Sequence, residues 1–154
     1  MQAQAEGLYW APNIGVGFNT VQQTYYRIGL DIGYQLDENI YFGVGAYYAF
    51  GDHPSDDREI GGGPFIGYHL PIIEMLSLEF REDIDYVDER NPVLLDDGTY
   101  TYTPAYGLES ATYAGVHLQF GRSFGVSGGY RLVVGNNTLV DGRSGAVLGL
   151  TIGI

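Results

Sequence analysis

The sequence predicts an all-β fold, an eight-stranded antiparallel up-and-down transmembrane β-barrel. From residue 8 to residue 154, strand-like segments place large apolar residues on even positions and glycine or polar residues on odd positions. This period of two indicates β-strands, because successive side chains of a strand point to opposite faces of the sheet. In the first segment the even positions hold Leu8, Trp10, Pro12, Ile14, Val16 and Phe18.

The volume of the apolar residues decides which face points outwards. If the even positions pointed inwards, roughly forty large side chains would have to fit into a barrel whose interior is only just filled by ordinary side chains. The apolar face therefore points towards lipid, and the glycine-rich face lines the interior. A soluble two-sheet sandwich is the alternative, but its outer face would be rich in Lys, Glu and Thr rather than in Gly and Tyr.

The strands are bounded by polar turn sequences and have about 9 to 13 residues, the length at which a tilted strand crosses the hydrocarbon. Short turns are expected at 37–39, 71–75 and 121–123, after the second, fourth and sixth strands. The other connections are mostly longer, and the longest is a loop over 87–110. The expected strands are Leu8–Thr20, Tyr25–Gln35, Ile40–Asp52, Glu59–Leu70, Leu76–Tyr86, Ala111–Phe120, Phe124–Val134 and Arg143–Ile154.

Short turns on the periplasmic side and longer loops outside are typical of outer-membrane barrels. We therefore expect both termini on the periplasmic side. Residues 1–7 are expected to be a flexible remnant left after signal cleavage, because Ala3 and Ala5 form an Ala-x-Ala pattern. The barrel then occupies residues 8–154 as one domain.

Aromatic residues are expected to form two girdles at the headgroup levels. The girdle beside the short turns comprises Trp10, Tyr34, Phe42, Tyr68, Phe120 and Phe124. The girdle towards the longer loops comprises Phe18, Tyr26, Tyr48, Phe50, Tyr86 and Tyr130.

Composition excludes several classes of function. The formal net charge of −12 argues against nucleic acid as a partner. The chain has no cysteine, so no disulfide stabilises it. It carries no Cys/His cluster, phosphate-binding loop or nucleotide fingerprint, and we expect neither a cofactor nor a metal. Acidic residues in the loops are interpreted as a solvated rim rather than a cation site.

The odd positions that carry charge predict a polar network in the lumen. Glu79, Arg81 and Asp83 are two residues apart, so they stack along one wall of the barrel. Because an unpaired charge in that narrow space is costly, partners on other strands are expected, and the lumen is predicted to be closed. The expected network comprises Arg27, Asp31, Glu79, Arg81, Asp83, His117 and Arg131.

The alternation over residues 8–154 resembles that of the small eight-stranded bacterial outer-membrane proteins: the OmpA transmembrane domain, OmpX and the opacity-type surface proteins. The last residues, 147–154, alternate as the family's assembly signal does, although they end in Ile154 rather than in an aromatic residue. The resemblance implies a monomer in the outer membrane, with lipid, lipopolysaccharide and the assembly machinery as partners.

The predicted function is that of a non-enzymatic, membrane-structural or surface-recognition protein acting through its extracellular loops. Asp97-Gly98 is a tight-turn signal inside the longest loop, and it predicts a hairpin that presents Tyr100 and Tyr102 beside Asp96 and Asp97. A hairpin that merely lengthens two barrel strands is the alternative. The extracellular ligand of such a surface stays unnamed.

Two other functions are considered. One is a narrow pore for small solutes. The other is a lipid-modifying enzyme, for which the loop 52–57 supplies His53 and Ser55 beside acids. Such residues are ordinary turn formers, and Pro54 restricts His53 to extended conformations, so no catalytic residue is assigned.

Overall fold

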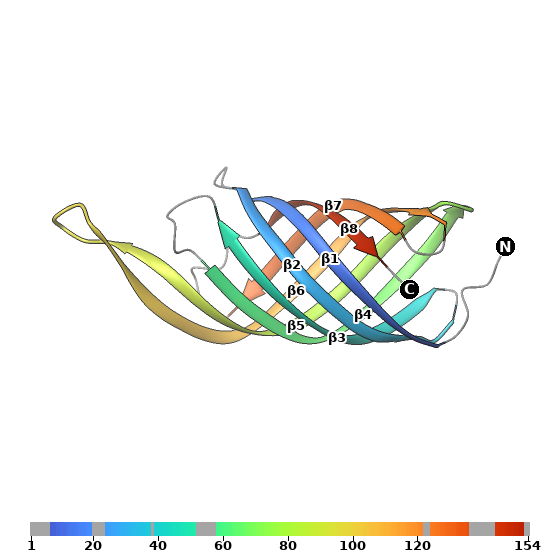
Figure 1. Ribbon diagram of the computed structural model, residues 1–154, viewed down its shortest axis with the longest axis horizontal. Coiled ribbons are helices and arrows are strands. Elements are labelled where there is room, and N and C mark those ends of the chain that lie inside the picture. Colours follow the sequence, from blue (N-terminus) through green and yellow to red (C-terminus); the bar gives the residue numbers. More distant parts are fainter. Residues whose placement is uncertain are drawn as a thin grey trace.

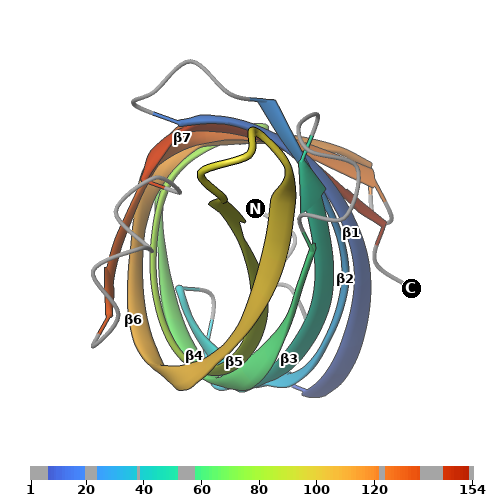
Figure 2. The ribbon, with the colours of Figure 1, turned by 90° about the vertical axis from the view of Figure 1, so that its left-hand side faces the viewer.

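The computed structural model describes residues 7–19, 24–37, 39–51, 58–121, 124–135 and 144–152. They form a closed antiparallel barrel in which each strand pairs with its neighbours in the chain and β8 returns to β1 (Figure 1, Figure 2). The predicted fold is confirmed. Nowhere in these ranges is there a helix of the length and apolarity that crossing a membrane requires. The strands are β1 Gly7–Asn19, β2 Thr24–Gln35, β3 Ile40–Gly51, β4 Arg58–Ile73, β5 Leu76–Leu94, β6 Tyr100–Phe120, β7 Phe124–Gly135 and β8 Gly145–Ile152.

Odd and even positions face the two sides that the alternation predicts. On β3, Val44 is 57% exposed on the outer surface, while Tyr47 is 5% exposed inside the lumen. The girdle residues that the structure describes lie on the outside and meet across strands, as in the ring pairs Tyr34–Phe42 and Tyr26–Phe50. An outer surface of Leu, Ile, Val and aromatic side chains fits hydrocarbon rather than water.

Glycines on the inner face let tyrosine rings lie flat against the wall. A Cβ on Gly17 would stand 2.1 Å from the Tyr25 ring, and one on Gly67 would stand 2.0 Å from the ring of Tyr41. Neither distance is possible for a real side chain. The pairing of tyrosine with glycine therefore fills the lumen without widening the barrel.

The ladder between β4 and β5 is interrupted near its middle. Gly62 pairs with Tyr86 and Phe65 pairs with Asp83, but no pairing joins Gly63 and Pro64 to β5. Proline has no amide hydrogen, so it cannot donate to a neighbouring strand. The ladder also shifts its register between Pro71 and Ile73, so β4 runs to Ile73 instead of ending at Leu70.

The prediction of a loop over 87–110 is wrong. β5 and β6 pair without a break from Leu76–Leu118 to Leu94–Tyr100, and only residues 95–99 lie between them. Within the described ladders, Asn91–Leu94 pair with β6 alone and Tyr100–Leu108 pair with β5 alone, so they project from the barrel as a two-stranded extension (Figure 1). We call these residues, with 95–99, the arm. The hairpin thus lengthens two barrel strands, which was the alternative.

Candidate functional site in the barrel lumen

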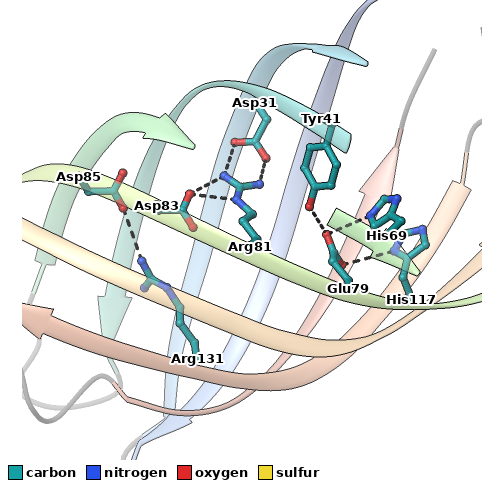
Figure 3. A network of polar contacts seen from close by, with 9 residues as sticks. All are labelled: Asp31, Tyr41, His69, Glu79, Arg81, Asp83, Asp85, His117 and Arg131. Atoms are coloured by element: carbon teal, nitrogen blue, oxygen red, sulfur yellow. Dashed lines mark hydrogen bonds and ion pairs between the residues drawn. The ribbon is translucent and has the colours of Figure 1, made fainter. Parts of the chain in front are cut away.

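One strand supplies the acidic wall of the lumen. Glu79, Arg81, Asp83 and Asp85 follow each other at every second position of β5, and all face the interior (Figure 3). Asp83 and Asp85 are 4% and 2% exposed. Carboxylates this buried need partners from other strands.

Arg81 joins two of these carboxylates at the centre of the lumen. Its Nη1 and Nη2 donate to Asp31 on β2, at 2.6 and 3.2 Å, in a bidentate pair. Nε and Nη2 donate to Oδ1 of Asp83, at 3.0 and 2.6 Å. The guanidinium also lies over the ring of Phe65, 3.9 Å from its centroid. Arg81 therefore ties β5 to β2 across the barrel (Figure 3).

Glu79 lies at the centre of the second cluster, which is nearer the short turns. The Tyr41 hydroxyl donates to it at 2.7 Å, and His69 Nε2 and His117 Nδ1 lie 3.4 and 3.8 Å from its two oxygens. The two imidazole rings stack at 5.5 Å with 16° between their planes. His117 also makes a 2.8 Å hydrogen bond to Gln119.

The third cluster lies towards the arm. The guanidinium carbon of Arg27 is 3.7 Å from the centroid of the Tyr47 ring, and that of Arg131 is 5.9 Å from it. Arg131 Nη2 is 3.5 Å from Oδ2 of Asp85. The ring of Tyr47 thus lies near two guanidinium groups, and that of Arg131 also pairs with Asp85.

A cavity of about 140 Å³ separates this polar network from the wall made by β1, β7 and β8. That wall is lined by small or uncharged residues, among them Asn13, Gly15, Ser127 and Gly149. The space is large enough for several water molecules. The lumen is therefore crossed by ion pairs without being filled.

The structure brings together all seven predicted lumen residues, but in three clusters rather than one chain. It adds Tyr41, His69 and Asp85 as partners that had been given no place in the network. Their odd positions showed that they face inwards, but no sequence signal revealed which strands they would meet.

The arm turn holds the predicted surface acids. Asp96 and Asp97 are exposed, and Gly98 has φ of 81°, which glycine adopts easily. The backbone of Tyr100 pairs with Leu94 and that of Tyr102 with Pro92. Asp97 Oδ1 accepts hydrogen bonds from the Thr99 amide at 2.9 Å and from its hydroxyl at 2.6 Å. These bonds hold the pKa of the Asp97 carboxyl below its usual value.

The remaining candidates are a catalytic loop and a metal site. The loop with His53 and Ser55 is outside the described residues. Within the described ranges, no group of three His, Cys, Asp or Glu side chains is arranged to hold a metal ion. The described histidines His69 and His117 both face the lumen, so neither reaches the lipid-facing surface.

A closed eight-stranded sheet with an apolar exterior and an ion-paired interior defines the transmembrane β-barrel class. No family model matches the chain, and no curated protein matches its sequence. Among solved structures, the N-terminal barrel domain of Pseudomonas aeruginosa OprF is similar with a TM-score of 0.68 at 16% identity, over 99% of this chain and 100% of that one.

Two further solved barrels have a TM-score of 0.55 at 14% identity. They are Neisserial surface protein A, matched over 99% of this chain and 97% of its own, and the outer membrane enzyme PagL, matched over 93% and 96%. The resemblance to small eight-stranded outer-membrane barrels is thereby confirmed for the fold. Because these proteins differ in what they do, the fold leaves the function to be argued from the sites.

Proposed function

We propose that the chain is a non-enzymatic outer-membrane protein with a closed lumen, surrounded by outer-membrane lipid and lipopolysaccharide, that presents the arm for surface recognition. The proposal rests on the contrast between the lumen and the arm. Inside the barrel Arg81 forms ion pairs with Asp31 and Asp83, whereas β5 and β6 extend far beyond the strands beside them. A paired arm is more rigid than a loop and holds its surface ready for a partner.

A closed lumen is supported by the contacts of Arg81. This side chain reaches across to β2 and holds Asp31 and Asp83 at once, so it blocks the centre of the barrel. In a planar lipid bilayer, the unmodified protein should show at most small and rare current steps. A large and steady conductance would contradict the closed lumen.

A narrow pore is the second candidate, and the 140 Å³ cavity beside β1, β7 and β8 favours it. Movement of Arg81 would join this cavity to the rest of the lumen. Arg81→Ala should raise the conductance if the ion pairs form the barrier. Unchanged conductance in a folded Arg81→Ala barrel would remove this candidate.

Deletion of the arm tests surface recognition. Residues 91–103 are replaced by Asn-Gly, which joins the paired positions Arg90 and Pro104 by a favoured two-residue turn. Bacteria displaying the intact or shortened barrel are compared for retention on cultured epithelial cells and on one another. We expect the barrel to remain folded and retention to fall. Equal retention by the two strains would contradict a recognition role for the arm.

A further inference from the structure

One ionisable side chain interrupts the lipid-facing surface. Among the described even positions of the strands, Asp, Glu, Lys, Arg or His occurs at Arg58, Glu82, Asp88 and Arg90. Arg58 begins β4, and Asp88 and Arg90 lie on the arm side of β5. Glu82 differs from these three, because its neighbours on the outer face, Phe80 and Ile84, are apolar and are 46% and 52% exposed.

Glu82 lies near the middle of the bilayer. It is six residues from Leu76, where β5 leaves the short turn, and four from Tyr86 in the opposite girdle. At about 3.3 Å per residue and a tilt of about 45°, six residues place it roughly 14 Å from the strand end, within a hydrocarbon layer of about 30 Å. Ionisable groups at this depth are costly and usually have a function.

Two hydroxyl groups hold the carboxylate in place. Ser110 Oγ donates to Oε1 of Glu82, and Thr112 Oγ1 donates to Oε2 at 2.5 Å. Both are on β6, at positions that would otherwise carry apolar side chains. An acceptor and two hydroxyls thus form one polar patch on the outside of β5 and β6. Among the described residues, no Arg, Lys or His forms an ion pair with Glu82.

The depth of this patch excludes reaction with lipid esters. Ester and headgroup atoms lie at the edge of the hydrocarbon, about half its thickness from Glu82. The described histidines, His69 and His117, face the lumen, so neither can activate Ser110. The patch therefore needs a partner that reaches the membrane centre.

The same outward face continues from the girdle at Tyr86 towards the arm. Tyr86, Tyr106 and Leu108 are 58%, 59% and 59% exposed, and the ladder pairs Tyr86 with Leu108 and Asp88 with Tyr106. The charge of Asp88 marks the level at which water begins. The Tyr106 ring at that level is not covered by lipid tails, so a protein partner that covers Glu82 would cover it too.

We infer that the outward face of β5 and β6 is an interface between two copies of this chain, in place of the monomer expected from the sequence. The face contains both the acceptor and the donors that it needs, so it is complementary to itself under a two-fold axis. With that axis along the membrane normal, the Ser110 and Thr112 hydroxyls exchange their bonds, so that those of one copy donate to Glu82 of the other. Hydrogen bonds of this kind associate proteins within lipid.

Association is measured by energy transfer in vesicles of phosphatidylcholine and phosphatidylglycerol over a range of protein-to-lipid ratios. The chain has no cysteine, so Leu36→Cys, in the short turn, provides one labelling site in every variant. We expect the unmodified protein to dimerise and Glu82→Leu to weaken association about tenfold or more. Glu82→Gln should stay within about threefold, because an amide still accepts and donates.

Folding does not confound this comparison, since leucine suits a lipid-facing position better than glutamate does. Leu30→Val is the control, because β2 lies on the opposite side of the barrel. Absence of dimers in the unmodified protein would overturn the inference. Equal association of the unmodified protein and Glu82→Leu would overturn it as well.

Cross-linking locates the interface independently. Ile84 pairs with Ser110 and lies beside the patch without belonging to it. Under mild oxidation in vesicles, Ile84→Cys should form disulfide-linked dimers, whereas Leu30→Cys should stay largely monomeric. Equal yields from the two positions would indicate random collision and contradict a specific interface.

Discussion

At the scale of single residues, the lumen contains buried charges, several of which are held in ion pairs between strands. Arg81 is the clearest example, because its guanidinium satisfies Asp31 on β2 and Asp83 on its own strand. Buried pairs of this kind contribute little compared with apolar packing, but breaking one leaves a charge that the protein cannot solvate. The lumen therefore tolerates loss of the whole cluster better than loss of one member.

Arg81→Met tests this asymmetry. The substitution leaves Asp31 and Asp83 buried without their cation, so the free energy of unfolding should fall by about 3–5 kcal/mol. The triple variant Arg81→Met, Asp31→Asn, Asp83→Asn should recover most of that loss. Urea titration in lipid vesicles measures both. A triple variant no more stable than the single one would contradict the pairing.

The sequence predicted which residues face the lumen, because parity alone decides the face of a strand. It did not predict the partners of Glu79. His69 lies opposite Glu79 in the ladder of β4 and β5, in a register that includes the irregularity between Pro71 and Ile73. Tyr41 comes from β3, and its contact with Glu79 depends on the stagger of the strands around the closed barrel. That stagger is a property of all eight ladders together, and no local pattern encodes it.

At the scale of elements, strands within lipid and strands beyond it follow different rules. Inside the membrane an outward side chain must be apolar, so alternation predicts the strand. In the arm both faces meet water, and polar residues such as Asn91 and Thr101 are compatible with continued pairing. For this reason the sequence indicated a loop over 87–110, although Asp97-Gly98 correctly predicted its turn.

Replacing an outward apolar residue by arginine tests the lipid-facing surface. Leu30→Arg or Leu148→Arg should lower the free energy of unfolding by roughly 2–4 kcal/mol, because both positions face the hydrocarbon. Leu95→Arg in the arm turn is the matched control and should change stability by less than about 0.5 kcal/mol. Equal effects at Leu148 and Leu95 would mean that the outer face does not meet lipid.

The arm turn should respond to acid. The hydrogen bonds from Thr99 stabilise the ionised form of Asp97 and lower its pKa, so their contribution is present at neutral pH. It is lost as the pH falls through that lowered pKa. The chemical shift of the Thr99 amide, followed by NMR during acid titration, should report a midpoint below that of an ordinary aspartate, about 3.9. In Thr99→Ala the midpoint of Asp97 should rise; an unchanged midpoint would contradict this account.

At the scale of the whole molecule, the sequence predicts the fold more directly than it predicts the function. Strand length, parity and turn spacing were enough to predict an eight-stranded transmembrane barrel, because a closed sheet is the β structure that satisfies all of its backbone groups in lipid. The surfaces that distinguish this chain depend on the strand register, which decides the residues that come together. They are the ion-paired lumen, the arm, and the face around Glu82.

A nitroxide scan along β3 determines whether the outward face, formed by the even positions, meets lipid. Single cysteines at Phe42, Val44, Ala46, Tyr48 and Phe50 are spin-labelled in vesicles, and collisions with oxygen and with a water-soluble nickel chelate are measured by electron paramagnetic resonance. We expect the labels to collide preferentially with oxygen, most strongly at Val44 and Ala46 and less towards Phe42 and Phe50. A label at Leu95 in the arm turn should favour the nickel chelate. Strong nickel collisions at Val44 and Ala46 would show that the even face is in water, and would contradict the transmembrane barrel.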